Sequence, residues 1–393
     1  MIPLPQSRFF CYNRGMRIGI DARFYGVGSK GLGRYTQKLI ENLESIVAEN
    51  SHHEYFVFLR KEVFDEYVPK NKKFYKVLAD YRWYSFSEQI NMPRILNKYN
   101  LDLVHFPHFN VPIFYNKPFV LTIHDLILLH FPTIKNSKLS PIFYWIKFIA
   151  YKLTIGSAIK RAKKIIAVSE FTKEDLIKNY KNAKNKVLVT YEGCDYFEDV
   201  NKIQKKDVDI KKYGIIRPYI LYVGNAYPHK NLENLILAFK DRSDKKVSLV
   251  LVGRLDYFYR KLESFVRVNN IENVVFTDFV ADEDLDNIYK NAKAYIFPSL
   301  YEGFGLPPLE AMKRNVPVAS SDHGCMLEIL GEAAIYFDGK NLKEIKNTIN
   351  KIVESRGLRE RLIAGGRFQA SKYSWESMAK KTLKIYKNIN LNG

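Results

Sequence analysis

The sequence predicts an α/β protein made of two doubly wound, parallel-sheet domains. Short apolar runs, typical of buried strands, alternate along the chain with longer stretches of helical periodicity. The alternation comes in two series, separated by the polar and charged segment 195–212, which we interpret as a linker. With 393 residues the chain is long enough to bury two full hydrophobic cores.

The first series, expected to form an N-terminal domain over 16–200, opens with a strand at 17–21. A helix is predicted at 33–50, because apolar residues recur there on one face. Further strands are predicted at 55–59, 103–106, 119–123 and 165–168. Residues 1–15 lack the apolar core of a signal peptide, so we expect a disordered extension or a start codon placed too early.

The second series is expected to form a C-terminal domain over 213–372. Its predicted strands are 219–223, 247–252, 274–277 and 294–297, and its predicted helices are 232–240, 257–269, 285–291 and one after Pro308. A last helix is expected within 373–393, where Trp375, Met378, Leu383 and Tyr386 have helical spacing. In such proteins a ligand binds at the carboxyl ends of the strands, here in a cleft between the domains.

The charge and the cysteine content restrict the classes of binding partner and the cellular compartment that we expect. The 62 Lys and Arg residues against 42 Asp and Glu give a net charge of +20, which fits an anionic substrate, an anionic membrane surface or nucleic acid. No zinc finger or RNA-recognition signature is present, so we expect no specific nucleic acid. Three widely spaced cysteines predict no disulfide framework and a reducing cytoplasm. No apolar run is long enough for a membrane span.

The segment 296–319 carries the clearest chemical pattern. A predicted strand leads into a loop with Gly303 and Gly305, and a helix then begins at a pair of prolines. Such a loop binds anions, because free N–H groups and the helix dipole point the same way. Glu302 and Glu310 would repel an anion unless they hold another group, and sugar hydroxyls suit them. The pattern therefore predicts a phosphate and a polyol together, as in a nucleotide-sugar.

Six segments, in order, resemble the glycosyltransferases of family 4. They are the opening strand and glycine-rich loop (16–36), Thr-x-His-Asp (122–126), Val-Ser-Glu-Phe-Thr (167–176), a donor-phosphate loop (222–235), the paired glutamates (302–310) and a terminal helix (374–386). The resemblance implies the GT-B fold of two facing Rossmann-like domains. It also implies that the N-terminal domain binds the acceptor, that the C-terminal domain binds the nucleotide-sugar, and that the last helix crosses back to the first domain.

The resemblance assigns the donor site. Glu310 is expected to bind the ribose hydroxyls, and Glu302 the donor sugar or its phosphate, although Glu310 beside a helix start also fits a simple dipole contact. Lys230 would neutralise the diphosphate, unless it is a solvated loop lysine. Asn225 stands where many relatives carry arginine, and Arg254 is a substitute for that charge. The backbone near the phosphates is expected from Gly31, Gly33, Gly224, Gly303, Phe304, Gly305 and Leu306.

Fewer residues are assigned to the acceptor site. His124 follows a predicted strand and, by resemblance, lies beside the reacting sugar; a core or capping histidine is the alternative. Asp125 is its expected companion, and His105 and His108 lie in a loop toward the acceptor. The expected catalytic set is therefore Glu302, His124 and Lys230. The pair Asp207 and Asp209 matches a manganese motif by letters only, so no metal and no cofactor are expected.

By the same resemblance the reaction is a retaining, metal-independent hexose transfer to a glycan or lipid-linked oligosaccharide in surface polysaccharide synthesis. GDP-mannose is the first donor suggested; a UDP- or dTDP-sugar, or a nucleotide-sugar epimerase of the same fold, remain alternatives. The stretch 126–169 has no acidic residue, eight Lys or Arg and several aromatic residues. It fits either a helix on an anionic membrane surface or one covering the core, so a location at the inner face of the membrane stays open.

Overall fold

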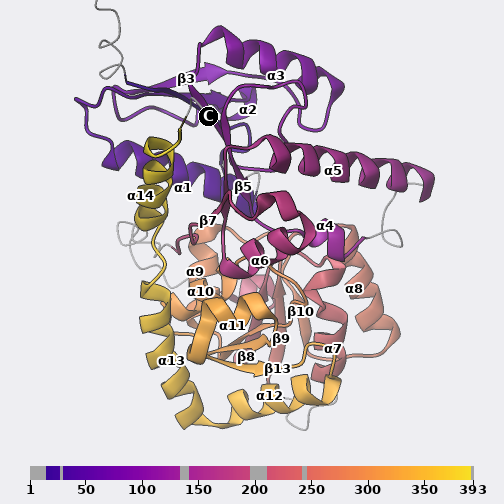
Figure 1. Cartoon of the computed structure of the whole chain (residues 1–393). Helices are drawn as coiled ribbons and strands as arrows, with labels where there is room; N and C mark the ends of the chain where they lie inside the picture. The colour runs from indigo at the N-terminus through magenta and orange to yellow at the C-terminus, as the bar shows by residue number, and fades with distance from the viewer. Residues whose placement is uncertain (1–14, 27–29, 133–140, 195–209, 241–245, 391–393) are drawn as a thin grey trace, which may run out of the picture.

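A computed structural model describes residues 15–26, 30–132, 141–194, 210–240 and 246–390. The predicted architecture is confirmed: two sheets, each wholly parallel, form the centres of two domains stacked one above the other (Figure 1). The predicted extension at 1–15 and the predicted linker at 195–212 fall almost entirely outside the described residues.

The N-terminal sheet has seven strands in the order β3-β2-β1-β4-β5-β6-β7. The strands are β1 (Arg17–Asp21), β2 (Glu54–Leu59), β3 (Phe74–Leu78), β4 (Leu103–Phe106), β5 (Phe119–Ile123), β6 (Lys164–Ala167) and β7 (Val187–Val189). The helices are α1 (Lys30–Ile46), α2 (Lys61–Phe64), α3 (Phe86–Lys98), α4 (Ile127–His130), α5 (Pro141–Arg161) and α6 (Glu170–Asn179). Both faces of the sheet are buried under separate apolar cores, as parallel sheets require.

The C-terminal sheet has six strands in the order β10-β9-β8-β11-β12-β13. The strands are β8 (Tyr219–Val223), β9 (Ser248–Val252), β10 (Val274–Phe276), β11 (Ala294–Phe297), β12 (Val318–Ser321) and β13 (Ala334–Phe337). The helices are α7 (Leu232–Lys240), α8 (Tyr257–Val268), α9 (Asp282–Lys290), α10 (Leu306–Lys313), α11 (Gly324–Leu330), α12 (Leu342–Glu354), α13 (Arg356–Ser371) and α14 (Trp375–Lys387). The order repeats that of the first domain, with a switch point between β8 and β11.

The sequence pattern missed some elements and misplaced others. Strands β3, β7 and β13 were not predicted, and all three lie at sheet edges, where one partner strand suffices; Lys76 interrupts the apolar run of β3, and β7 has only three residues. Helix α1 begins at Lys30 rather than at Gly33, so Gly31 and Gly33 lie in its first turn and not in a preceding loop. Glycine costs only about 1 kcal/mol in a helix, which burial of the apolar face of α1 offsets.

Helix α14 ties the end of the chain to the first domain. It follows α13 out of the C-terminal domain and lies along α1 (Figure 1). Trp375, Met378 and Tyr386 are buried in the same apolar core as Ile18 and Leu39. The two domains are therefore joined by packing of the last helix as well as by the chain connection.

The carboxyl ends of both sheets point toward the space between the domains. The loops after β4 and β5 meet the loops after β8, β9 and β11 there, and α6 packs against α11 beside them. Within the described helices, none has both the length and the apolar character needed to cross a bilayer.

Candidate active site

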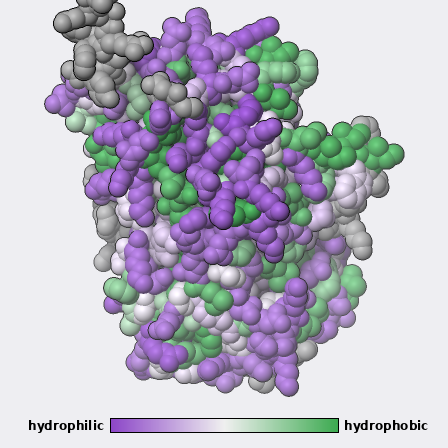
Figure 2. All heavy atoms as spheres, viewed as in Figure 1, coloured by the Kyte–Doolittle hydropathy of each residue, from purple (hydrophilic) through white to green (hydrophobic). Residues whose placement is uncertain are grey.

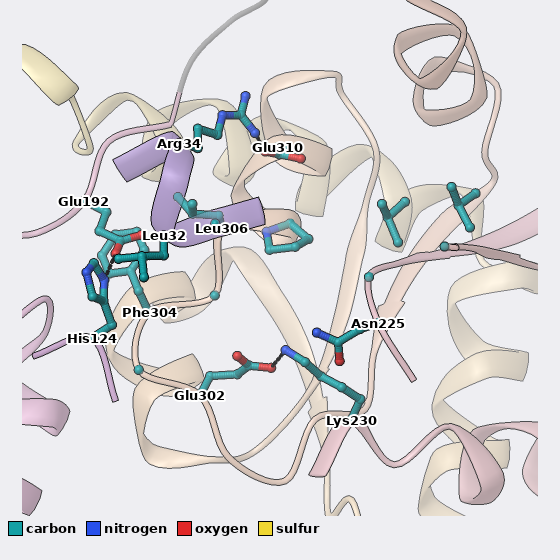
Figure 3. Close-up of a pocket in the computed structure, with 18 of the residues that line it drawn as sticks. Leu32, Arg34, His124, Glu192, Asn225, Lys230, Glu302, Phe304, Leu306 and Glu310 are labelled. Atoms are coloured by element: carbon teal, nitrogen blue, oxygen red, sulfur yellow. Dashed lines mark hydrogen bonds and ion pairs between the residues drawn. The ribbon is translucent and has the colours of Figure 1, made fainter. Parts of the chain in front are cut away.

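A cleft of about 970 Å³ lies between the two domains. Its walls come from α1 and the loops after β4 and β5 on one side, and from the loops after β8, β9 and β11 on the other (Figure 3). Most of the predicted site residues line it: Gly31, His108, His124, Asp125, Gly224, Asn225, Lys230, Arg254, Glu302, Gly303, Phe304, Gly305, Leu306 and Glu310. Gly33 is buried in α1 and is not among the lining residues.

Glu302 and Lys230 form an ion pair at the base of the cleft. The Nζ atom of Lys230 lies 2.5 Å from Oε1 of Glu302, and the Ser299 hydroxyl donates to the same oxygen at 2.5 Å. Burial is the largest single influence and opposes charge on Glu302, but the Lys230 ammonium, with smaller contributions from His229 and the Ser299 hydrogen bond, outweighs it and lowers the pKa of the carboxyl. Glu302 is therefore an ionised carboxylate, and Lys230 is held at a fixed place.

The turn that carries Lys230 is fixed by Asn231. Asn231 adopts a left-handed conformation with φ of 60°, which asparagine tolerates better than most residues. Its side-chain amide donates to the carbonyl oxygens of Pro298 and Gly339 at 3.1 and 2.6 Å. These bonds fasten the loop after β8 to the end of β11, which brings Lys230 and Glu302 together.

Glu310 lies on α10 and contacts both domains. Arg34 of α1 reaches across the cleft, with its Nη1 atom 2.5 Å from Oε1 of Glu310, and Tyr289 donates to the other carboxylate oxygen at 3.3 Å. Figure 3 shows the two side chains facing one another from opposite domains. The carboxylate expected to bind ribose thus already has a cationic partner, which the sequence pattern did not reveal.

The start of α10 presents a small set of backbone donors. Gly305 precedes the helix with φ of 87°, a conformation that favours glycine. Pro307 and Pro308 have no N–H group, so the donors near the cleft are those of Phe304, Gly305 and Leu306. Among the hydrogen bonds of the described residues, none uses these three N–H groups. They are placed to bind an anion at the helix start.

The loops after β8 and β9 touch each other beside this helix start. A Cβ built on Gly253 would overlap the carbonyl oxygen of Gly224, so glycine is needed for the approach. The Tyr259 hydroxyl donates to that same oxygen of Gly224 at 2.8 Å. Asn225 and the exposed Arg254 follow these glycines and line the cleft together.

His124 is held from both of its ring nitrogens. Its Nδ1 atom lies 2.9 Å from Oε1 of Glu192, and its Nε2 atom lies 2.9 Å from the carbonyl oxygen of Pro107. A carbonyl and a carboxylate both accept, so both nitrogens donate and the ring is an imidazolium. Burial opposes this charge, but the Glu192 hydrogen bond and charge raise the pKa of His124. His124 is thus a fixed cation that lines the cleft.

The remaining acceptor-side residues divide between the cleft and the core. Asp125 lines the cleft and accepts from the N–H of Ile127 at 2.9 Å, which caps the short helix α4. His108 lines the cleft between the rings of Phe24 and Phe109, and burial lowers its pKa to about 3.

The expectation that His105 faces an acceptor is wrong. His105 lies within β4 rather than in a loop, and it is fully buried. It bonds the hydroxyls of Tyr386 and Thr122 at 2.6 and 2.8 Å. Its role is to join the sheet to α14, because a strand residue that points into the core cannot reach the cleft.

Several site residues escaped the sequence pattern: Arg34, Glu192, Gly253 and Ser299. Arg34 lies in a helix of ordinary composition, and Glu192 lies in a polar stretch after β7. The glycine directly after strand β9 was a signal that could have been used for Gly253. Within the part of the chain that the structure describes, no group of three or more His, Cys, Asp or Glu residues is placed to hold a metal ion.

Two family models match the chain, one for each domain. Residues 29–196 match the family described as Glycosyltransferase Family 4, and residues 205–369 match Glycosyl transferases group 1. The two matches cover the N-terminal and C-terminal walls of the cleft.

Curated relatives and solved structures agree with the two glycosyltransferase family models. The chain is 27% identical over 338 residues to the O-antigen chain mannosyltransferase RfbU of Salmonella typhimurium, covering 83% of this chain and 88% of that protein. It is 29% identical over 250 residues to O-antigen chain mannosyltransferase B of Escherichia coli, covering 60% of this chain and 63% of that protein. Anabaena HepE, solved with UDP and glucose, has a TM-score of 0.70 at 16% identity, covering 95% of this chain and 99% of that chain.

Proposed function

Since this chain belongs to the family 4 and group 1 glycosyltransferases and is a hexosyltransferase, we propose that it moves mannose from GDP-mannose to a glycan or a lipid-linked oligosaccharide. The product would belong to a surface polysaccharide. The observation that carries the proposal is the Lys230–Glu302 pair beside the free N–H groups at the start of α10. Together these groups offer positive charge for a diphosphate and a carboxylate for sugar hydroxyls.

In the proposed donor complex the diphosphate lies between Lys230 and the N–H groups of Phe304, Gly305 and Leu306. Arg254 and Asn225 border the same part of the cleft. Glu310 binds the ribose hydroxyls, which then share its carboxylate with Arg34 or displace that guanidinium. Glu302, kept ionised by Lys230, accepts from hydroxyls of the transferred sugar.

The proposed transfer retains the anomeric configuration. The bond between the sugar and the diphosphate breaks as the acceptor oxygen forms a bond on the same face, and the acceptor proton passes to a leaving phosphate oxygen. Lys230 and the N–H groups at the start of α10 stabilise the charge that grows on the diphosphate. Both ring N–H groups of His124 already donate to Glu192 and to the Pro107 carbonyl, so we assign to His124 a fixed positive charge beside the reacting sugar rather than the acceptance of a proton.

The proposal needs no metal ion or organic cofactor, because the cationic groups named above can balance the diphosphate. It places the enzyme in the cytoplasm, where nucleotide-sugars are available and cysteines stay reduced. A UDP-sugar is the second candidate donor, since HepE was solved with UDP and glucose. A nucleotide-sugar epimerase would differ from both transferases, because it would convert the nucleotide-sugar into an epimer without any acceptor.

The first test is calorimetric titration of the protein with GDP, UDP, ADP and dTDP in the presence of a chelator. We expect GDP to bind most tightly, which would support a metal-independent site for a GDP-sugar. Tightest binding of UDP would move the proposal to a UDP-sugar. Absence of binding by all four nucleotides would overturn the donor site. Incubation with GDP-mannose alone, followed by product analysis, separates transfer from epimerisation.

A further inference from the structure

Helix α5 has two unlike halves. Its C-terminal half is anchored in the N-terminal domain, where Ile155, Ala158 and Ile159 are buried in the core together with Ala162, which directly follows the helix. Arg161 at its end donates to the carbonyl oxygens of Pro112 and Tyr115. The N-terminal half projects beyond the rest of the domain (Figure 1). The anchored half fixes the direction in which the projecting half points.

The projecting half carries large apolar side chains in water. Between 48% and 72% of the surface of each is exposed: Ile142, Trp145, Ile146, Ile149 and Leu153. At about 100° per residue these positions fall within one stripe of roughly 100°. Figure 2 shows this projecting segment as a hydrophobic region beside mostly hydrophilic surface. An apolar stripe of this kind marks an interaction surface.

The charges around the stripe select its partner. Lys147 and Lys152 are both exposed; at about 100° per residue, Lys152 lies just beyond one edge of the stripe and Lys147 lies on the opposite face of the helix. The whole stretch 126–169 has no acidic residue, and the chain carries a net charge of +20. A second copy of the chain would bring lysines against lysines, whereas an anionic lipid surface is complementary. Trp145 within the stripe fits the headgroup level of a bilayer, where tryptophan is enriched.

The length of the stripe fits a helix lying on a membrane and not crossing it. Residues 142–153 span about 17 Å at 1.5 Å per residue, well short of the ~30 Å hydrocarbon core. The rest of α5 packs one face into the core of the N-terminal domain. We propose that the stripe Ile142, Trp145, Ile146, Ile149 and Leu153 docks the enzyme on the surface of an anionic bilayer.

An aromatic row joins this docking surface to the cleft. The ring of Phe109, which lines the cleft, lies 4.9 Å from the ring of Tyr151 on α5. Tyr151 lies 6.4 Å from Phe148, and Phe148 lies 5.6 Å from Trp145. Aromatic faces suit both sugar rings and lipid chains. Docking would therefore bring the acceptor side of the cleft to the bilayer. The placement of an acceptor there, and the choice of a lipid-linked one, rest on the proposed function.

The test measures partition of the full chain onto vesicles by co-sedimentation. One vesicle is phosphatidylcholine alone and the other contains phosphatidylglycerol as well. We expect at least a tenfold higher partition coefficient on the anionic vesicles, reduced by added salt. The double variant Ile146→Glu with Ile149→Glu should lower it by about tenfold or more, since two apolar side chains no longer enter the interface.

A matched control replaces two exposed apolar residues of the other domain, Ile216→Glu with Val268→Glu. It adds the same charge and should partition as the unaltered chain does. Equal partition on both vesicles, or an α5 variant that binds like the control, would overturn the proposal. So would a dimer that the α5 variant converts to a monomer, together with absence of vesicle binding.

Two further measurements keep the outcomes distinct. Trp145 fluorescence should shift to shorter wavelength on anionic vesicles, and Trp145→Phe should abolish that shift. GDP titration of the same α5 variant should be unchanged, because these residues lie outside the cleft. If the unaltered chain binds a nucleotide but not the anionic vesicles, the docking proposal alone is overturned. If it binds the vesicles but no nucleotide, the proposed function alone is overturned.

Discussion

Gly303 packs directly against the backbone of His124 across the domain boundary. A Cβ built on Gly303 would overlap the carbonyl oxygen of His124, and backbone at this place cannot move aside as a side chain would. The carbonyl oxygen of Gly303 in turn accepts from the Ser169 hydroxyl at 2.6 Å. The loop that carries Glu302 is thereby set against the strand end that carries His124, so the two walls of the cleft are held in register.

Gly303→Ala should separate the two halves. We expect kcat/KM for transfer to fall about 100-fold, because a displacement on the order of 1 Å in a reacting geometry costs that much. Nucleotide affinity should change less, since most donor groups lie within one domain. Gly357→Ala is the matched control, because a Cβ there meets no atom within 4 Å. Steady-state kinetics equal for both variants would contradict a positional role for this contact.

Glu328→Ala should loosen the same boundary at α6. The Glu328 carboxylate, on α11, accepts from the N–H groups of Glu170 and Phe171 at 2.8 and 2.7 Å, and so caps a helix of the other domain. Loss of such a cap costs about 1–2 kcal/mol of unfolding free energy. Urea denaturation measures it, with Glu332→Ala as an exposed control. Amide exchange at Glu170 and Phe171 should accelerate; unaltered exchange there would rule out the cap.

Lys230→Met should slow the chemical step more than it weakens donor binding. Removing one cation from a preorganised site that stabilises growing charge costs on the order of 100-fold to 1,000-fold in kcat. Glu302 would keep only the Ser299 hydroxyl as a partner, so the pKa of its carboxyl should rise. Single-turnover kinetics separates the two effects. Lys351→Met, at an exposed lysine of α12, should leave the rate unchanged.

Glu310→Gln should act mainly on nucleotide affinity. Hydrogen bonds to a charged group are worth about 1.5–3 kcal/mol, so the dissociation constant for GDP should rise roughly tenfold to 100-fold. The variant also frees Arg34 from its ion pair. Calorimetry checks the prediction, with the exposed Glu354→Gln as control. An unchanged dissociation constant would remove Glu310 from the ribose site.

His105 should make the fold sensitive to mild acid. Burial, and to a smaller extent the charge of His124, lowers its pKa to about 3 from an ordinary value of about 6.5. Between these values the unfolded chain binds a proton that the folded chain does not. The free energy of unfolding therefore falls as pH falls below about 6.5, by up to ~1.4 kcal/mol per pH unit.

Urea unfolding at several pH values between neutral and mildly acidic measures this slope. His105→Gln should reduce it by the share of one histidine, up to ~1.4 kcal/mol per pH unit, whatever that variant does to stability at neutral pH; buried His108 contributes a share of its own. His52→Gln, at an exposed histidine, should leave the slope as it was. A slope that is the same in all three proteins would contradict the assignment of the proton to His105.

Local patterns were enough for the central strands and for most of the proposed donor site. β8 and β11 are continuous apolar runs, because a strand buried on both faces must be apolar throughout. Glu302, Gly305 and Glu310 were recognisable because a glycine loop, two prolines and a helix follow one another within a short segment. The edge strands β3, β7 and β13 were missed, although the edge strand β10 was recognised; Lys76 interrupts the apolar run of β3, and β7 has only three residues.

By itself the sequence determined two parallel-sheet domains and predicted a nucleotide-sugar type of site, since both follow from chemistry within a few neighbouring residues. Only the tertiary structure decided which distant groups are partners: Arg34 with Glu310 across the cleft, Glu192 with His124 within one wall, and His105 with Tyr386 in the core rather than with an acceptor. The members of these pairs are separated by 68 to 281 positions. Their contact depends on how two sheets and a terminal helix pack, and no local spacing encodes that.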